Sequence, residues 1–348
     1  MPAFLWPVVL YASIFALHAA LPARVVDGYV LGADGKPLRY RLNGLWVFFV
    51  SIGLWVAACR GGLLAWDAFF VHRWELLAGA CGLGLLFTGV VVFTAPPVPS
   101  FFRGLFLGRV EQPRWLGDRV DLKMFLYLLG ATVLELNLLS FAAHHVLTAA
   151  PNGEISKGVV LYVALFSFFL IEYLFFERVH LYTWDFVAEG VGFKLGWGCF
   201  VFYPFFYGIG LWTTAHLGWP GWPEWVLIPI ALLFFLGWAF ARGANMQKYA
   251  FKRDPSRAPD AIGGKILASG FWGLSRHINY LGEVLMATAL TLALGHPEVV
   301  WPWLYPLFYV LMLSARQRDD DKRCAAKYGA LWEEYCRRVP WRIVPYVY

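Results

Sequence analysis

The densest group of side chains that could do chemistry lies in residues 270–283, Gly-Phe-Trp-Gly-Leu-Ser-Arg-His-Ile-Asn-Tyr-Leu-Gly-Glu. Within it, Arg276, His277, Asn279 and Tyr280 bring a guanidinium, an imidazole, a carboxamide and a phenol together. The surrounding chain is apolar, and polar groups near hydrocarbon are costly unless they meet a ligand, a partner or water. We interpret this stretch as a ligand site whose glycines let the backbone approach the ligand closely.

A second polar group recurs every four residues, at Arg316, Asp320, Cys324 and Tyr328. On a helix this spacing makes one stripe, which Gly329 could interrupt. A plain helix on a membrane surface would carry apolar residues along one face. The mixture of cation, anion, thiol and phenol therefore indicates contact with a ligand.

Two cations, Lys248 and Lys252, lie four residues apart and share a helical face. Paired cations on one face suit a ligand that carries phosphate, and they suit anionic lipid headgroups equally well.

Two acids, Asp185 and Glu189, have the same spacing and are predicted to share a helical face. Two carboxylates close together at low dielectric raise the pKa of one of them, which supplies a proton donor near neutral pH. The alternative is an interfacial loop whose acids are simply solvated.

The elements that carry these residues are predicted to be membrane helices. The chain is 59% hydrophobic, 19% aromatic and only 15% charged, which is typical of a polytopic membrane protein. The apolar segments are 4–21, 45–59, 76–93, 125–147, 159–176, 195–216, 226–241, 281–294 and 301–313. Several are shorter than the ~20 residues that a crossing needs, so some borrow flanking residues or only re-enter. We expect an all-α bundle of eight to ten transmembrane helices.

Charge predicts the orientation, because 15 of the 29 Lys and Arg residues lie in residues 242–276 and 316–342. Both stretches are expected to face the cytosol, and a topology signal alone could explain them. We expect one membrane domain over 1–348, with N-terminal helices in 1–190 and the binding half in 191–348. The five cysteines form no CxxC pair, so no metal site is expected.

Several blocks of sequence resemble the sterol reductases, a family that includes delta(14)-sterol reductase, 7-dehydrocholesterol reductase, delta(24(28))-sterol reductase and the lamin B receptor transmembrane domain. The blocks are YRLNGL at 40–45, DLKMF at 121–125, GFKLGWG at 192–198, PFFY at 204–207, ANMQKYAF at 244–251, residues 269–283 and residues 318–348. They run nearly from end to end, and the last two are highly specific.

The resemblance implies an NADPH pocket that opens to the cytosol. The matching positions are Lys248, Lys252, Leu267, Trp272, Asn279, Tyr280, Arg316, Asp320, Cys324 and Tyr328. The two lysines are assigned to the cofactor's phosphates. The family usually has Arg at position 252, and Lys keeps the charge but loses bidentate geometry. Cys199 and Glu283 also depart from the family, which often has an acid at the first position and usually Asp at the second.

The implied reaction reduces a carbon-carbon double bond in a sterol. Such a bond is not polarised toward hydride, so a proton must reach one carbon while NADPH supplies hydride to the other. Our candidates for the proton side are Tyr207, Asp185 and Glu189. We expect contact with membrane lipid, in the endoplasmic reticulum of a eukaryote or the inner membrane of a bacterium. Neither nucleic acid nor an obligate protein partner is expected.

Alternatives stay open at this point. The C-terminal motifs favour the delta(14) bond, with delta(7) and delta(24(28)) as the other candidates. A membrane methyltransferase of the isoprenylcysteine type shares some C-terminal motifs, but Ile278 stands where that family has Pro. A non-catalytic sterol binder would have lost the cofactor residues, which are almost all intact here. A transporter would show an internal repeat, and the sequence shows none.

Overall fold

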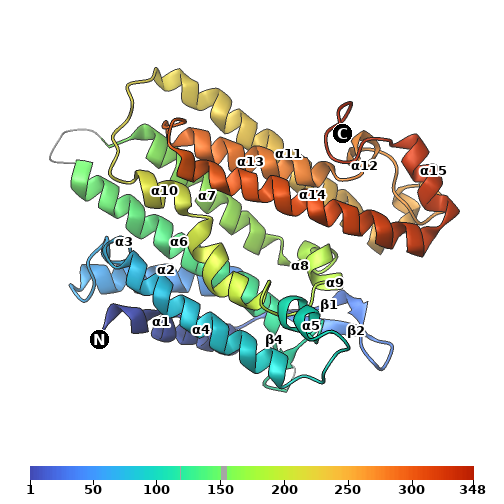
Figure 1. Ribbon diagram of the computed structural model, residues 1–348, viewed down its shortest axis with the longest axis horizontal. Coiled ribbons are helices and arrows are strands. Elements are labelled where there is room, and N and C mark those ends of the chain that lie inside the picture. Colours follow the sequence, from blue (N-terminus) through green and yellow to red (C-terminus); the bar gives the residue numbers. More distant parts are fainter. Residues whose placement is uncertain (118, 150–154) are drawn as a thin grey trace. The chain divides into compact units, whose positions relative to one another are not determined.

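Helices predominate within residues 1–117, 119–149 and 155–348, which the structure describes, and two short sheets accompany them. In this computed structural model the chain divides into two units, Met1–Gly218 and Trp219–Tyr348. Their elements are labelled in Figure 1. The prediction of one domain with an internal boundary at residue 190 stays a prediction. The boundary between the two units lies after Gly218 in the sequence.

Unit 1 contains most of the elements. They are η1 (Ala3–Leu5), α1 (Trp6–Ala20), β1 (Arg24–Leu31), β2 (Pro37–Leu42), α2 (Gly44–Arg60), α3 (Ala68–Val71), α4 (Arg73–Phe93), α5 (Phe101–Leu107), β3 (Arg114–Trp115), β4 (Val120–Asp121), α6 (Leu122–Ala149), α7 (Lys157–Phe175), α8 (Glu177–His180), α9 (Trp184–Val187), η3 (Gly198–Phe206) and α10 (Ile209–Thr214).

Unit 2 is built around three long helices, α11, α13 and α14, with α11 against α13 and α13 against α14 (Figure 1). Its elements are η4 (Glu224–Val226), α11 (Leu227–Arg253), η5 (Pro255–Arg257), α12 (Phe271–Leu274), α13 (Ile278–Ala293), α14 (Val300–Tyr328) and α15 (Ala330–Arg338).

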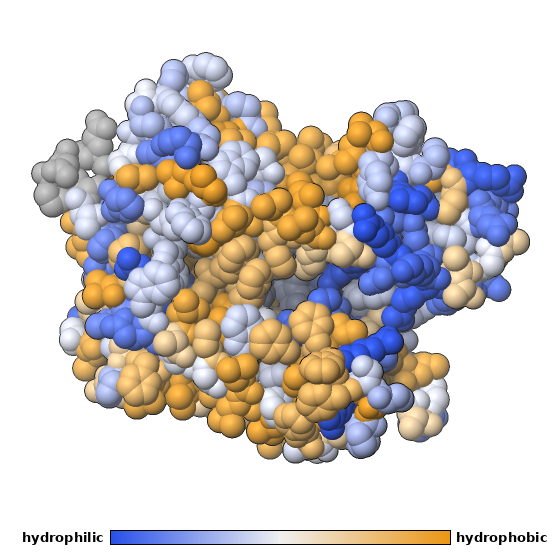
Figure 2. Space-filling model, in the orientation of Figure 1, coloured by the Kyte–Doolittle hydropathy of each residue, from blue (hydrophilic) through white to orange (hydrophobic). Residues whose placement is uncertain are grey.

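The described residues include five helices that are long and apolar enough to cross a membrane, and two shorter apolar helices. The long ones are Ala3–Ala20, Arg73–Phe93, Leu122–Thr148, Lys157–Phe175 and Glu224–Arg253, and the shorter ones are Gly44–Arg60 and Ile278–Ala293. Figure 2 shows broad hydrophobic areas on the face in view, as expected where helices contact lipid. The protein is thus a helical membrane protein, while eight to ten crossings stays a prediction.

Helix α6 forms the centre of unit 1 and packs against α1, α2, α7 and η3. Its polar residues Glu135 and Asn137 are buried, as expected for polar groups that must avoid lipid. Ser167 Oγ donates to Glu135 Oε1 at 2.8 Å, and Asn137 Nδ2 donates to the Pro204 carbonyl at 2.8 Å. Each bond ties α6 to a different neighbouring element.

The apolar segment at 195–216 is not one regular helix. It contains a π-helix, η3, followed by the short helix α10. Pro204 lies inside η3 and has no N–H to give to a regular helical ladder. Asn137 meets the Pro204 carbonyl from outside the helix. π-helical turns occur frequently at functional sites, and Tyr207 is the residue that directly follows η3.

The all-α prediction is wrong for residues 24–42, which form an antiparallel hairpin. Strand β1 pairs with β2, and Val26 lies opposite Tyr40. Tyr40 is buried in an apolar cluster that includes Met124 and Phe186, and its ring covers Gly28. The inner face of this hairpin packs on α6 and α9, and that packing stabilises the sheet. Strands β3 and β4 form a second, two-residue pairing.

In unit 2, α11 and α13 cross where two glycines meet. A Cβ at Gly282 would lie 2.4 Å from the Gly237 carbonyl oxygen, and one at Gly237 would lie 2.6 Å from that of Gly282. Small residues of this kind let membrane helices approach closely. The predicted end of the long C-terminal helix is confirmed, because α14 stops at Tyr328 and Gly329 has a φ of 53°.

Candidate functional site

The turn that begins the polar stretch at 270–283 is held by Gln247 of α11. Gln247 Nε2 donates to the Ser269 carbonyl at 3.0 Å, and the Phe271 N–H donates to Gln247 Oε1 at 3.0 Å. Gly270 lies between them with a φ of 60°, and a Cβ there would lie 2.4 Å from Gln247 Nε2. Only glycine fits this position.

Trp272 follows the turn and lies against α11. Its Nε1 donates to the Ala244 carbonyl at 2.9 Å, and Lys248 Nζ lies 5.0 Å from the centroid of its ring. Leu267 and Trp272 belong to one buried cluster with Ala244 and Phe251. The structure thus brings together Lys248, Leu267 and Trp272, which the resemblance had assigned to one cofactor.

Three lysines whose charges act on one another lie near the ends of two helices, Lys248 and Lys252 on α11 and Lys327 on α14. The ammonium groups of Lys248 and Lys327 both repel that of Lys252, and Asp320 attracts it. Lys327 was not among the predicted residues, although its place one helical turn after Cys324 could have indicated it. Converging cations of this kind suit an anionic group.

The stripe on α14 is confirmed as part of one continuous helix, Val300–Tyr328. Cys324 Sγ lies 4.0 Å from Asp320 Oδ1. Burial, and secondarily the Asp320 charge, raises the pKa of the Cys324 thiol to about 12. This thiol is therefore neutral at physiological pH. Both Cys324 and Tyr328 pack against the apolar cluster that contains Trp332.

Asp321, which the sequence had not singled out, binds the polar stretch to α14. Its carboxylate lies 3.5 Å from Arg276 Nη1 and 3.9 Å from Arg342 Nε, and it accepts a hydrogen bond from Gln317. Burial opposes its charge, but His277 and the two guanidinium groups outweigh that effect and hold the pKa of Asp321 below its usual range.

The turn into α13 is also tied to the last residues of the chain. The Arg276 N–H donates to the Trp341 carbonyl at 2.9 Å, and Ser275 Oγ donates to that of Ile343 at 2.8 Å. Asn279 follows, and its Oδ1 is buried without a hydrogen-bond donor among the described residues. A buried acceptor of this kind indicates a missing partner.

The predicted shared helical face of Asp185 and Glu189 is wrong. Helix α9 is Trp184–Val187, so it ends before Glu189. Helix α9 stops there because the buried Lys123 side chain takes carbonyls that a longer helix would use. The Lys123 ammonium donates to the carbonyls of Asp185 and Phe186 at 3.0 Å and to that of Glu189 at 2.8 Å. Glu189 is itself buried, and its carboxylate accepts from Lys194 Nζ at 2.9 Å and from Trp184 Nε1 at 3.2 Å.

Tyr207, the third candidate on the proton side, is partly exposed at the end of η3. Its ring lies 4.8 Å from that of Tyr203 and 6.1 Å from that of Phe202. The catalytic roles of Tyr207, Asp185 and Glu189 stay predictions.

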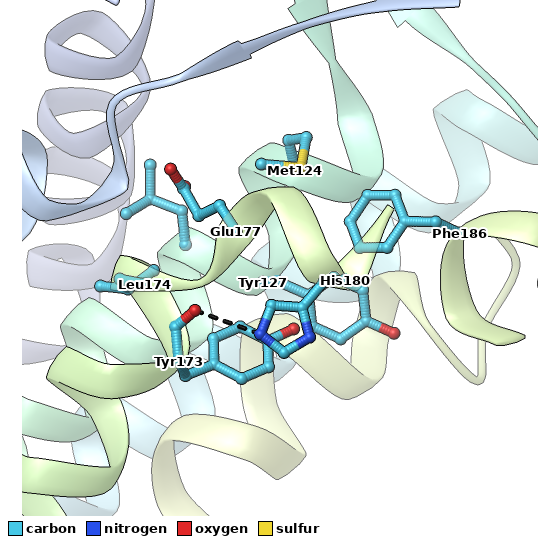
Figure 3. A pocket seen from close by; sticks show the side chains of 8 residues that line it. Met124, Tyr127, Tyr173, Leu174, Glu177, His180 and Phe186 are labelled. Carbon is cyan, nitrogen blue, oxygen red and sulfur yellow. Dashed lines mark hydrogen bonds between the residues drawn. The ribbon is translucent and has the colours of Figure 1, made fainter. Parts of the chain in front are cut away.

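A small cavity in unit 1, drawn in Figure 3, lies beside α8. It is lined by Met124, Tyr127, Leu128, Tyr173, Leu174, Glu177, His180 and Phe186. The Gly44 N–H donates to both Glu177 oxygens, at 3.1 and 3.3 Å, while burial raises the pKa of Glu177 to about 8. His180 Nε2 donates to the Tyr173 carbonyl at 3.1 Å (Figure 3). The sequence predicts no role for these residues.

Among the described residues, no three His, Cys, Asp or Glu side chains converge as metal ligands. The polar stretch of unit 2 instead combines the lysine ammonium groups, the ring of Trp272 and the Asn279 Oδ1, which has no hydrogen-bond donor among the described residues. That combination suits an organic anion more than a metal ion.

Comparison with known proteins gives one consistent result. A sequence model described as the ergosterol biosynthesis ERG4/ERG24 family matches residues 3–348. A delta(14)-sterol reductase of Arabidopsis thaliana is 33% identical over 94% of this chain and 91% of its own length. A delta(14)-sterol reductase of Methylotuvimicrobium alcaliphilum is 33% identical over 97% of this chain and 82% of its own length. A delta(14)-sterol reductase of Mus musculus is 33% identical over 99% of this chain and 86% of its own length. The predicted family is confirmed.

Proposed function

The chain belongs to the ergosterol biosynthesis ERG4/ERG24 family, and from that membership we propose that it is an NADPH-dependent delta(14)-sterol reductase. The three relatives above carry that activity in their names and match at least 94% of this chain. Their names favour the delta(14) bond over the delta(7) and delta(24(28)) bonds. The match from residue 3 to residue 348 also argues against a methyltransferase, which would explain only the C-terminal motifs.

The observation that carries the proposal is that the charges of Lys248 and Lys327 both act on Lys252, while Lys248 lies over the ring of Trp272. NADPH carries phosphate groups, which these three cations would hold. Trp272 and Leu267 would form an apolar wall. These residues therefore fit the cofactor, and their retention favours an enzyme over a non-catalytic sterol binder.

Asn279 and Asp320 complete the proposed site. The unmet Oδ1 of Asn279 would accept from a donor on the bound molecule, such as a carboxamide. Asp320 lies close to both Cys324 and Lys252, so it would set the charge of the site between α11 and α14. Bound NADPH would supply hydride to the sterol, and the chain's own residues would bind it and orient it.

The proton side is assigned to unit 1. Glu189 is engaged by Lys194 and Trp184, so we assign it an orienting role. Tyr207 is partly exposed and carries an O–H, and we assign it the delivery of the proton. Asp185 is also partly exposed, and we assign it the resupply of that proton. Lys123 would keep Asp185 and Glu189 in place through their carbonyls.

The test is an incubation of the purified protein in detergent with NADPH and a mixture of delta(14), delta(7) and delta(24(28)) sterols. We expect mass spectrometry to show that only the delta(14) sterol gains two mass units. Reduction of another sterol would move the assignment to that bond. Binding of NADPH with no reduction of any sterol would favour the non-catalytic binder.

A further inference from the structure

Helix α5 presents three phenylalanine rings on its surface. Phe102 is 80% exposed, and Phe101 and Phe106 are 53% and 51% exposed. Their positions on the helix place the three side chains on one side, and the exposed Arg103 lies at the edge of that side. Gly104 is buried on the opposite side. The helix therefore carries an aromatic face that is bordered by a cation.

Helix α5 is held at the end of a membrane helix. The preceding helix, α4, is long and apolar enough to cross a membrane, and the proline-rich connection 94–100 stops it from continuing. Directly after α5, Arg109 returns to the end of α4. Its guanidinium lies 5.4 Å from the centroid of the Phe93 ring, and its Nη1 donates to the Ala95 carbonyl at 3.2 Å. These contacts keep α5 near the level at which α4 leaves the hydrocarbon.

We propose that α5 is an interfacial helix, whose phenylalanine rings insert at the boundary between lipid headgroups and acyl chains while Arg103 contacts anionic headgroups. Helices with an apolar face and a basic border lie in the plane of the interface, and cations there attract anionic lipid. A bilayer is the occupant that the structure favours, because the aromatic face follows the exposed apolar surface of α4. On that surface Leu86 and Phe93 are 65% and 60% exposed.

The end of α5 is bonded to a segment far along the chain. The Phe193 N–H donates to the Leu105 carbonyl at 2.9 Å, and the Lys194 N–H donates to the Phe106 carbonyl at 2.9 Å. The ring of Phe106 also stacks on that of Phe193, with centroids 6.3 Å apart. Docking of α5 on the bilayer is therefore expected to order residues 193 and 194 as well.

This order extends to the ion pair of Lys194 and Glu189, whose Nζ and Oε1 lie 2.9 Å apart. Glu189 has an orienting role in the proposed function, so the effect of docking on the reaction rests on that function. The docking itself and the order of the segment do not depend on it. Both are measured without NADPH or sterol.

The first measurement places a fluorescent label at Phe102→Cys in the full-length protein, in nanodiscs of phosphatidylcholine and phosphatidylglycerol. Lys36→Cys is the control, because Lys36 is exposed in the turn of the hairpin. The unmodified protein has five cysteines, and its signal after the same labelling is subtracted. Quenching by iodide in the water is compared with quenching by lipids that carry a nitroxide near the headgroup.

We expect the nitroxide lipids to quench the label at position 102 more than iodide does, and the reverse at position 36. Equal iodide quenching at the two positions would overturn the inference, because α5 would then lie in water. Shielding of position 102 from both quenchers would also overturn it, since a second copy of the chain would then cover the helix.

The second measurement follows amide hydrogen exchange at Phe193 and Lys194 in the same nanodiscs. The variant combines Phe101→Ser with Phe102→Ser and leaves Phe106, which itself touches Phe193, unchanged. Leu63→Ser is the matched control, since Leu63 is 85% exposed and lies between α2 and α3. We expect exchange about tenfold faster in the double variant and unchanged in the control. Unchanged exchange in the double variant would contradict the inference.

Arg103→Glu gives an independent reading if the double variant does not fold, because it keeps every apolar side chain. It should speed exchange at residues 193 and 194 in nanodiscs that contain phosphatidylglycerol and leave it unchanged in phosphatidylcholine alone. Equal exchange in the two lipids would count against the inference. Any of these failures leaves the proposed function intact, and absence of NADPH binding would remove the proposed function without affecting the docking of α5.

Discussion

Gln247 and Gly270 are in direct contact, and no side chain larger than hydrogen fits between them. A Cβ at Gly270 would lie 2.4 Å from Gln247 Nε2, while Gln247 bonds the backbone on both sides of that glycine. The contact fixes the turn from which Trp272, Asn279 and Tyr280 follow. It therefore connects the two lysines of α11 to the polar stretch.

Gly270→Ala should lower both stability and cofactor affinity, because it strains the backbone and displaces Gln247. Gly264→Ala is the matched control, since Gly264 has a φ of 65° but no atom within 4 Å of a Cβ. The control should lose about 1 kcal/mol of unfolding free energy. Gly270→Ala should lose a further ~2 kcal/mol beyond the loss in the control. Thermal unfolding in detergent would measure both. Equal losses would mean that the Gln247 contact contributes nothing.

Lys252→Glu and Lys327→Glu should each weaken NADPH binding by about tenfold or more, since each reverses a charge in the lysine group. Arg253→Glu makes the same change of net charge at the neighbouring position, where Arg253 donates to the Tyr249 hydroxyl. It should have a much smaller effect. Titration calorimetry would compare the three. Unchanged affinity in the first two would indicate that these lysines contact lipid headgroups instead.

Lys123→Met should destabilise unit 1 by about 3 kcal/mol, because three carbonyls, two of them in buried hydrogen bonds, lose their donor at roughly 1 kcal/mol each. The turnover rate should fall as Asp185 and Glu189 lose their position, while NADPH affinity stays the same. Lys194→Met removes only the ion pair with Glu189 and should cost less. Stability and NADPH affinity would be measured together. A loss of NADPH affinity in Lys123→Met would contradict this account of its role.

Glu177 should make the protein less stable as the pH rises. Burial raises its pKa from 4.5 to about 8 in the folded protein, so the folded state holds a proton that the unfolded state has released. Stability should then fall between about pH 4.5 and 8, by up to about 1.4 kcal/mol per pH unit. Glu177→Gln keeps an acceptor for the Gly44 N–H and should remove that slope. The same slope in both proteins, by denaturant unfolding, would exclude Glu177 as its source.

Patterns within single elements predicted several features of the fold and the site. The stripe on α14 and its end at Gly329 follow from helical spacing and glycine geometry, which depend on local sequence alone. The family followed from sequence blocks spread over the whole chain.

Contacts between distant residues account for what the sequence did not predict. Helix α9 ends before Glu189 because Lys123, more than sixty residues earlier, donates to the carbonyls of Asp185, Phe186 and Glu189. The hairpin at 24–42 depends on packing against Met124 and Phe186. Spacing along one helix could not indicate that Asp321 would meet His277.

The most direct test of the central claim follows the two hydrogens into the product. The protein would be incubated with a delta(14) sterol and NADPH deuterated at the transferred position of the nicotinamide, and in a second reaction with unlabelled NADPH in heavy water. We predict one deuterium per reduced sterol from the cofactor in the first reaction, and one from the solvent in the second. A reduced sterol without deuterium from the cofactor, or no reduced sterol at all, would contradict the account.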